Sequence, residues 1–394
     1  MSHTLRLTLR TLCYPLKTDL LKLAPVSSPQ TCRYLYAKAT IGIDAFREQQ
    51  KQTKSQMLNI EAKFRERMKG FAAEDSSSMI FTEDLKNMVH IAETDEDFDL
   101  VVKMAKKFNG QNKQLRFGNF VFGPVVMRML HVFNKPDLAL ECFKSPELEG
   151  LFDQLITYQI LLDLLYENDK YQEMLEVFDL VKGKQLQGAK YPRNAVVLVM
   201  AGCYKLNSKE GTEYALNLWN ELMAAGHFPM RRATTFCAGL ALNQGKPEVA
   251  LEILGAVKNP NYVTIRNLKV RALSEIGRVE DAIVLLKSVI ATDQPGEVTQ
   301  TFNKEVMECV KAAVDKLENP DLTLEYNKVE KLFEKEGHIS DLTLDSHLCS
   351  EIQQPPIMNN RQINKFSRFR DNTRNTGDSG YNRPQRRPGL KEMV

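Results

Sequence analysis

The chain has 394 residues, of which 43% are hydrophobic and 26% charged, and a formal net charge of +3 at pH 7. No stretch approaches the roughly 20 predominantly apolar residues that a membrane-spanning helix needs, so no membrane span is predicted. The seven cysteines are scattered without Cys-x-x-Cys spacing, which argues against a disulfide framework and against a zinc site.

The charge is divided unevenly along the chain. Residues 1–36 carry a net charge of +4 and residues 360–394 carry +6, so the segment between them carries −7. A body that is acidic overall is not a general binder of polyanions. Any contact with nucleic acid must therefore be local.

Residues 1–36 are basic, leucine-bearing and rich in hydroxyl groups, and they contain a single acid. This composition is typical of a mitochondrial transit peptide. Arg6 and Arg10 interrupt the continuous apolar core that a secretory signal would need. We therefore predict import into the mitochondrial matrix, with processing near Arg33–Ala37; the alternative is a basic arm that binds a partner.

Residues 37–79 are predicted to form an N-terminal helical extension and a linker. A sparse apolar stripe between Ile43 and Met68 runs through a highly charged segment, which indicates an exposed helix packed on the first repeat. The run 71–79 has the composition of a linker. The acids after Thr82 favour a helix start there, so the solenoid is expected to begin at residue 80.

From residue 80 to residue 337 the chain repeats a pair of amphipathic helices, most clearly over 155–295. In the unit 155–181 the helices are predicted over 155–166 and 171–181. Each second helix carries a small or apolar residue and, four positions later, a bulky apolar one on the same face. These pairs are Ala139/Phe143, Met174/Phe178, Ala215/Trp219, Ala250/Leu254 and Ala282/Leu286. Their spacing of 35, 41, 35 and 32 residues predicts a solenoid of helical hairpins.

The type of repeat follows from particular stretches. Several stretches resemble the pentatricopeptide repeat: the first-helix stretch 155–162 (Leu-Ile-Thr-Tyr-Gln-Ile-Leu-Leu), the junctions 190–193, 226–230 and 259–265, and the second helix 214–229. The resemblance implies an all-α fold, namely a right-handed superhelical solenoid of antiparallel helix pairs similar to that of tetratricopeptide repeats. It also implies that the partner is single-stranded mitochondrial RNA, read by two or three side chains per unit.

The resemblance and the basic residues together define candidates for contact with RNA. The RNA-binding candidates are Gln159, Arg193, Arg231, Arg232, Thr235, Asn261, Arg266 and Lys269. Gln159, Thr235 and Arg266 fall at the base-facing position of three first helices. In the unit between the first two, that position falls on Val197 or Leu198, which have no hydrogen-bonding side chain, so no complete base code is expected. The basic candidates would contact phosphates if they share a face; otherwise they are ordinary solvated charges.

Residues 338–394 are predicted to be a disordered, polar, arginine-rich tail. Its arginines are interleaved with Phe366, Phe369 and Tyr381, a composition that would add affinity for RNA without reading its sequence. The alternative is a solubilising end that has no partner.

No catalytic, cofactor or metal site is predicted. The six histidines form no metal-binding motif and are expected at the surface or at junctions. Asp95, Glu96, Asp97 and Asp99 resemble the carboxylates of a metal-dependent nuclease. With Thr94 they are better interpreted as the start of a helix, where negative charge is stabilised.

Two classes of function remain. The first is a non-catalytic adaptor that binds mitochondrial RNA and acts in the maturation, processing or stability of transcripts, and thereby in respiratory-chain function. RNA-processing or ribosomal proteins would be further partners. The alternative is a helical-repeat scaffold that binds a mitochondrial ribosomal or respiratory-complex assembly protein, because this fold serves both purposes.

Overall fold

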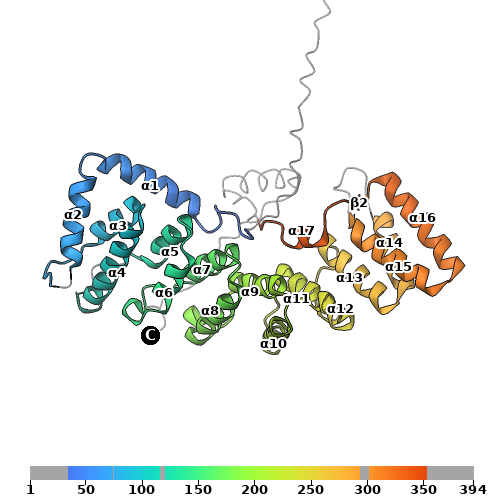
Figure 1. The fold of residues 1–394 in the computed structure, drawn as a ribbon. Helices are drawn as coiled ribbons and strands as arrows, with labels where there is room; N and C mark the ends of the chain where they lie inside the picture. The colour runs from blue at the N-terminus through green and yellow to red at the C-terminus, as the bar shows by residue number, and fades with distance from the viewer. Residues whose placement is uncertain (1–33, 74, 116–119, 293–300, 353–394) are drawn as a thin grey trace, which may run out of the picture. The chain divides into compact units, whose positions relative to one another are not determined.

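The structure is a computed structural model that describes residues 34–73, 75–115, 120–292 and 301–352 (Figure 1). In these ranges nearly all regular structure is helical, and the exceptions are two strands of two residues each. The predicted all-α helical-repeat class is thus confirmed. The predicted helices at 155–166 and 171–181 are observed as α7 (Leu155–Glu167) and α8 (Tyr171–Lys184).

Two helices precede the repeats, and the repeats then alternate a first and a second helix. The preceding helices are α1 (Ile43–Met57) and α2 (Glu61–Ala72). The first helices are α3 (Thr82–Ile91), α5 (Gly123–Val132), α7, α9 (Arg193–Leu206), α11 (Arg231–Asn243), α13 (Val263–Ile276) and α15 (Lys304–Leu317). The second helices are α4 (Asp95–Leu115), α6 (Pro136–Lys144), α8, α10 (Lys209–Ala224), α12 (Pro247–Gly255), α14 (Val279–Thr292) and α16 (Pro320–Glu336). Two short 3-10 turns, η1 (Pro146–Leu148) and η2 (Leu186–Gly188), lie between units.

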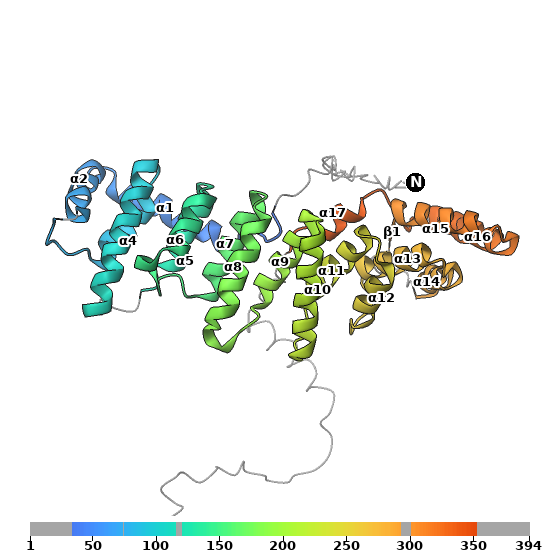
Figure 2. The same ribbon diagram turned by 60° about the horizontal axis from the view of Figure 1, so that its bottom comes forward.

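The small-and-bulky pattern sets the core of the array. All ten residues of the five pairs are buried; the small or apolar members are at most 1% exposed and the bulky members at most 7%. Each first helix packs on its own second helix and on the first helix of the next unit, from α5 through α15. Figure 2 shows these helices following one another along the chain. The core is therefore continuous from one unit to the next, as stacked repeats require.

The turn between the two helices of a unit recurs with one conformation. A residue with positive φ stands in the turn of six successive units: Asn134, Asp169, Asn207, Gly245, Gly277 and Glu318. Glycine, asparagine and aspartate tolerate this left-handed conformation best, and five of the six positions hold one of them. These turn residues thus fix how each second helix folds back on its partner.

The two ends of the described chain meet on the first helices. Tyr36 forms a β-bridge with Ile352, and the backbone N–H of Ile352 donates to the carbonyl of Leu35 at 2.7 Å. Further contact comes from β1 (Phe302–Asn303), which pairs in parallel with β2 (Ile339–Ser340), and from α17 (Leu344–Leu348), which packs on α11 and α13 (Figure 1).

The tail was predicted to start at residue 338, and this start is wrong. The C-terminal segment 338–352 is ordered, and Leu344 and Leu348 are at most 4% exposed. Apolar residues in this segment bury against the repeats, which offsets the entropy of ordering it. The predictions for residues 353–394 lie outside the described residues.

Polar contacts to three first helices, and packing on a fourth, fix the C-terminal segment. Arg232 of α11 donates to the Leu348 carbonyl at 2.6 Å and to Ser350 Oγ at 2.8 Å. Lys205 of α9 contacts both carboxylate oxygens of Asp345 at 2.9 Å. The remaining contacts come from α13, which packs on α17, and from Glu305 of α15, which accepts from the Leu344 N–H. The segment therefore crosses the first helices of several units.

This coverage explains an unusual property of the central first helices. Residues 157–166 of α7, 195–204 of α9 and 233–242 of α11 are buried without interruption. A helix normally keeps a polar face toward water. Here neighbouring helices cover the other sides, and segments 34–42 and 338–352 add the remaining cover.

The predicted transit peptide falls almost entirely outside the part of the chain that the structure describes. Residues 1–33 of the predicted transit peptide lie outside the described residues, whereas Leu35 and Tyr36 are at most 3% exposed and form part of the core. Within the described ranges, no helix has both the length and the apolar character needed to cross a bilayer.

Candidate nucleic-acid interface

Three successive junctions between units each place a cation over an aromatic ring. At the α8–α9 junction Lys190 lies 5.2 Å from the centroid of the Tyr191 ring. The next two junctions pair with each other. Arg231 of the α10–α11 junction lies 3.8 Å from the ring centroid of Tyr262 in the α12–α13 junction, and Lys258 of the latter lies 4.5 Å from that of Phe228 in the former. Such pairs are attractive because the face of an aromatic ring is electronegative.

These junctions form one continuous edge. The rings of Tyr191 and His227 lie 5.8 Å apart, which links the first junction to the second. A pocket of about 230 Å³, lined by residues that include Phe228, Arg231 and Tyr262, links the second junction to the third. We call the edge formed by residues 190–193, 226–231 and 256–266 the junction edge.

The pocket on the junction edge combines stacking surface with positive charge. Phe228 is 60% exposed and Tyr262 is 41% exposed, although large aromatic side chains normally bury most of their surface. Arg231 and Lys258 are exposed beside them. Bases stack on exposed rings and phosphates bind exposed cations, so this arrangement suits an unpaired polynucleotide.

The predicted candidates fall into two groups in the structure. Arg193, Arg231, Asn261 and Arg266 lie on the junction edge, and Arg266 Nη2 donates to Asn261 Oδ1 at 3.2 Å. Lys269, one turn along α13 from Arg266, is half-buried, and burial lowers the pKa of its ammonium group.

The other three candidates are engaged inside the chain. Gln159 is 4% exposed, and its amide oxygen accepts from Asn194 Nδ2 at 2.8 Å. Thr235 is 1% exposed, and its hydroxyl donates to the carbonyl of Arg232 at 2.9 Å. The Arg232 guanidinium holds the C-terminal segment, as described above.

Sequence reasoning did not assign the aromatic residues of the junction edge. Tyr191, Phe228 and Tyr262 stand in junction stretches that each contain a proline, and those stretches were used only to recognise the repeat. The available signal was the recurrence of an aromatic residue within two positions of a junction proline in three successive units. A proline-bearing junction cannot continue a helix. At two of these junctions the aromatic residue, Phe228 or Tyr262, is exposed, whereas Tyr191 is 9% exposed.

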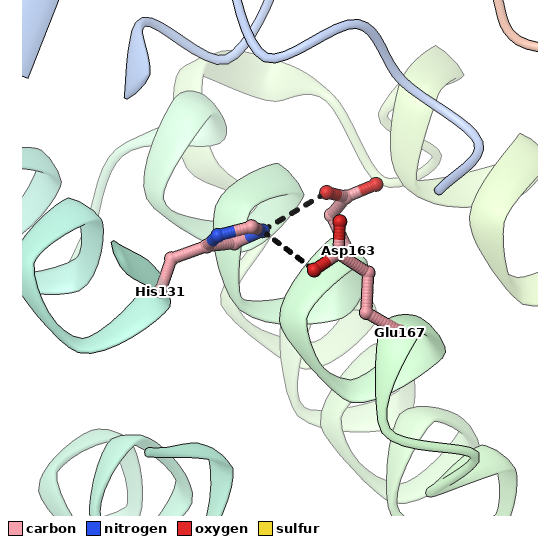
Figure 3. A group of neighbouring side chains, drawn as sticks. All are labelled: His131, Asp163 and Glu167. Carbon is pink, nitrogen blue, oxygen red and sulfur yellow. Dashed lines mark hydrogen bonds and ion pairs between the residues drawn. The ribbon is translucent and has the colours of Figure 1, made fainter. Parts of the chain in front are cut away.

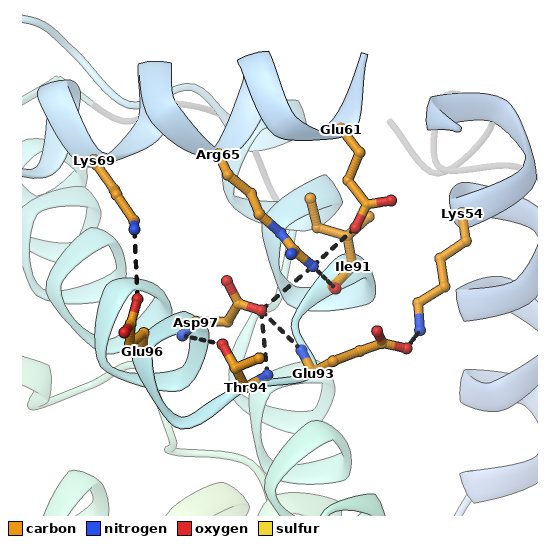
Figure 4. Close-up of polar contacts among 9 residues, drawn as sticks. All are labelled: Lys54, Glu61, Arg65, Lys69, Ile91, Glu93, Thr94, Glu96 and Asp97. Carbon is orange, nitrogen blue, oxygen red and sulfur yellow. Dashed lines mark hydrogen bonds and ion pairs between the residues drawn. The ribbon is translucent and has the colours of Figure 1, made fainter. Parts of the chain in front are cut away.

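The acids at the start of α4 form a helix N-terminus, as predicted. Asp97 Oδ2 accepts the backbone N–H groups of Glu93 at 3.1 Å and Thr94 at 3.2 Å, and Thr94 Oγ1 accepts from the Asp97 N–H. This reciprocal arrangement is a capping box. Arg65 Nη2 lies 3.3 Å from the same carboxylate oxygen, as Figure 4 shows. The Asp97 carboxylate is thus used by the fold.

Comparisons with known proteins identify the chain's relatives. No family model matches the sequence. A zebrafish (Danio rerio) protein named pentatricopeptide repeat-containing protein 2, mitochondrial, is 30% identical over 278 residues, which cover 70% of this chain and 71% of the relative. The chain belongs to this family. Proteins of the same name from Xenopus laevis and Homo sapiens are each 27% identical over 274 residues, covering 69% of this chain and 70% and 69% of their own lengths.

Membership of the family confirms the resemblance drawn from the junctions and first helices. The central first helices α7, α9 and α11 are buried without interruption over ten residues each. Segments 34–42 and 338–352 contact the side that these helices share, which we call the first-helix face. The chain therefore combines the pentatricopeptide architecture with a first-helix face that its own terminal segments cover.

Proposed function

We propose that the chain is a non-catalytic RNA-binding protein of the mitochondrial matrix that holds a single-stranded segment of a mitochondrial transcript along the junction edge. Binding of this kind would alter the maturation, processing or stability of the transcript and so support the respiratory chain. The family relationship supports the mitochondrial assignment through the names of the relatives. The basic composition of residues 1–36 supports it independently.

The observation that carries the proposal is the set of cation–aromatic pairs at three successive junctions. Each junction contributes one ring and one positive charge, and the second and third junctions pair crosswise, Arg231 with Tyr262 and Lys258 with Phe228. An unpaired strand also alternates bases and phosphates at regular intervals. Stacking accepts any base, so this surface favours affinity over sequence recognition.

The mechanism needs no active site. A strand held on the junction edge is blocked from a nuclease or from pairing into a hairpin. The second helices remain available for a processing or ribosomal protein. Affinity is expected to come largely from phosphate contacts, because the first-helix candidates Gln159 and Thr235 are buried.

The test is fluorescence anisotropy of short labelled single-stranded RNAs titrated with the full chain over a range of salt concentrations. Arg231→Ala should weaken binding and lower the slope of log affinity against log salt by about 0.7, the contribution of one phosphate contact on a single strand. Phe228→Ala should weaken binding by about 1–3 kcal/mol without changing that slope, because it removes stacking and no charge.

Arg278→Ala is the matched control. Arg278 is also an exposed arginine next to a helix start, but it lies in the turn within a unit and pairs with Asp281 at 2.6 Å. Its replacement should leave RNA affinity unchanged. Failure of the full chain to bind RNA at low salt would overturn the proposal and leave the protein-binding scaffold as the function to test.

A further inference from the structure

A histidine and two carboxylates converge between two neighbouring first helices. His131 stands in the last turn of α5, and Asp163 and Glu167 stand one turn apart on α7. His131 Nε2 lies 3.1 Å from Asp163 Oδ2 and 4.0 Å from Glu167 Oε2. Figure 3 shows the imidazole pointing at both carboxylates. The three side chains can bring one ligand atom each to within 4.8 Å of the others.

The cluster is buried and incompletely bonded. Asp163 is 0% exposed and His131 is 6% exposed. Asp163 Oδ1 and Glu167 Oε1 are both shielded from solvent without a hydrogen-bond partner among the described residues. Burial raises the pKa of both carboxyl groups. Two carboxylates at this depth require positive charge close by.

The protein's own lysine and arginine side chains act on these carboxylates only from a distance, since the charge of Lys38 lowers the pKa of both groups without outweighing burial. Lys38 and Arg47 line the adjoining pocket of about 320 Å³, together with His131 and Glu167. Among the described residues, neither forms an ion pair with Asp163 or Glu167, and Lys38 lies over the ring of Tyr34 instead. The His131 imidazole is therefore the one group that directly contacts either carboxylate with a charge-bearing nitrogen in the described structure.

Asp97 shows what a satisfied buried aspartate looks like in the same chain. It is 4% exposed, and one of its oxygens accepts two backbone N–H groups and lies beside Arg65 (Figure 4). Asp163 has no arginine or lysine in that role. The difference sets the His131 cluster apart from an ordinary helix cap or buried ion pair.

We propose that His131, Asp163 and Glu167 bind a divalent transition-metal ion, with Zn²⁺ as the best fit. Imidazole nitrogen and carboxylate oxygen are both zinc ligands, at bond lengths of about 2.0–2.2 Å. Around a tetrahedral ion with such bonds, two ligand atoms lie roughly 3.4 Å apart. The observed separations of 3.1 Å and 4.0 Å bracket that value, so small side-chain rotations complete the set.

Three protein ligands leave a fourth position for water, which the adjoining pocket can supply, whereas structural zinc sites usually have four protein ligands. The structural role expected here rests on the position of the cluster between α5 and α7. Asn168 Nδ2 donates to Asn134 Oδ1 at 2.6 Å and to the Leu164 carbonyl at 2.8 Å, so the chain just beyond His131 is already tied to the end of α7. An ion at the cluster would join α5 to α7, and thus one unit to the next.

The experiment measures Zn²⁺ binding to the full chain, first stripped with a chelator, by calorimetry and by the thermal unfolding midpoint. One ion per chain is expected, with a rise in the midpoint that chelator reverses. Co²⁺ serves as the spectroscopic probe, because a tetrahedral nitrogen–oxygen site gives a characteristic visible absorption. His131→Gln, Asp163→Asn and Glu167→Gln should each weaken the affinity at least about tenfold.

Asp97→Asn is the matched control, because it neutralises a buried aspartate elsewhere and should leave Zn²⁺ affinity unchanged. Glu167→Gln decides the result if the other two variants fail to fold, since the Glu167 side chain is 20% exposed and its loss disturbs the core least. Absence of binding by the wild-type chain would overturn the proposal. Binding that Glu167→Gln leaves unchanged in affinity and stoichiometry would also overturn it, by showing an adventitious ion only.

Discussion

Arg231 and Arg232 are neighbours at the start of α11, and they belong to two different surfaces. Arg231 lies on the junction edge, exposed and stacked on Tyr262. Arg232 points to the first-helix face and donates to Leu348 and Ser350 of the C-terminal segment. One residue is available to a partner, and the other holds the chain together.

This difference extends to the whole of each surface. On the first-helix face, the polar groups of Gln159, Thr235 and Arg232 form hydrogen bonds within the chain. On the junction edge, the rings of Phe228 and Tyr262 are exposed, and so is one cation at each of three successive junctions. A repeat architecture therefore does not by itself tell which surface is free, because segments outside the repeats can cover one of them.

The largest change in the free energy of unfolding is expected when the apolar contact of the C-terminal segment with the first helices is removed. Leu348 is 0% exposed, and its side chain lies against Gly239, where the Tyr204 ring also packs. Leu348→Ala should lower the free energy of unfolding by about 2–4 kcal/mol, through lost burial and the cavity left behind. Urea denaturation measures this loss.

Leu342→Ala is the control for that variant. Leu342 is in the same segment but is 47% exposed, so its truncation should cost far less. Equal losses from the two variants would contradict close packing of α17. A gain in RNA affinity with Leu348→Ala would instead show that the covered first-helix face is the binding surface, and would reverse the comparison.

The next largest effect distinguishes Arg231 from Arg232 by the loss of stability that follows each substitution. Arg232→Ala leaves the Leu348 carbonyl without its donor and should lower the free energy of unfolding by about 2 kcal/mol. Arg231→Ala should change it by no more than about 0.5 kcal/mol, since Arg231 is exposed. RNA affinity should respond in the opposite order. Unfolding free energy and RNA affinity are measured for both variants. Equal changes in the two variants would contradict the assignment of the two arginines to different surfaces.

The fold was largely predictable because its cause is local and periodic. The pairs from Ala139/Phe143 to Ala282/Leu286 located the second helices, and their spacing gave the length of each unit. The C-terminal segment was missed because its contacts are distant in sequence: Arg232 and Leu348 are 116 positions apart. The uninterrupted apolar run 195–203 of α9 was the available signal, since a first helix without a polar face must be covered.

The candidate sites show the same limit. The basic residues of the junction edge were found by their charge, but their aromatic partners appear only when adjacent junctions are brought together. His131 was expected at the surface or a junction because no sequence motif surrounds it. It lies 32 positions before Asp163, close to one repeat length, and stacked repeats place such residues side by side.

A smaller effect is expected from the ion pair that also holds the C-terminal segment. The side chains of Lys205 and Asp345 are 29% and 46% exposed, so water screens their attraction. Lys205→Met and Asp345→Asn should each lower the free energy of unfolding by about 1 kcal/mol or less. A double-mutant cycle isolates the pair from other effects of each substitution. A coupling energy larger than the stability lost in Arg232→Ala would show that the Lys205–Asp345 ion pair, more than the backbone contacts of Arg232, fixes the segment.

The smallest effect is expected at Gln159, which the repeat pattern places opposite a base. It tests whether the first-helix face or the junction edge binds RNA. Gln159 is buried, its oxygen accepts from Asn194, and its Nε2 has no hydrogen-bond partner among the described residues. Gln159→Leu removes that unsatisfied donor and leaves only the half-exposed Asn194 amide to be solvated, so the free energy of unfolding should change by no more than about 1 kcal/mol, in either direction. RNA affinity should not change, because Gln159 lies off the junction edge. A selective loss of affinity for one base, with stability unchanged, would show that a first helix reads RNA despite its burial and would require segments 34–42 and 338–352 to move when RNA binds.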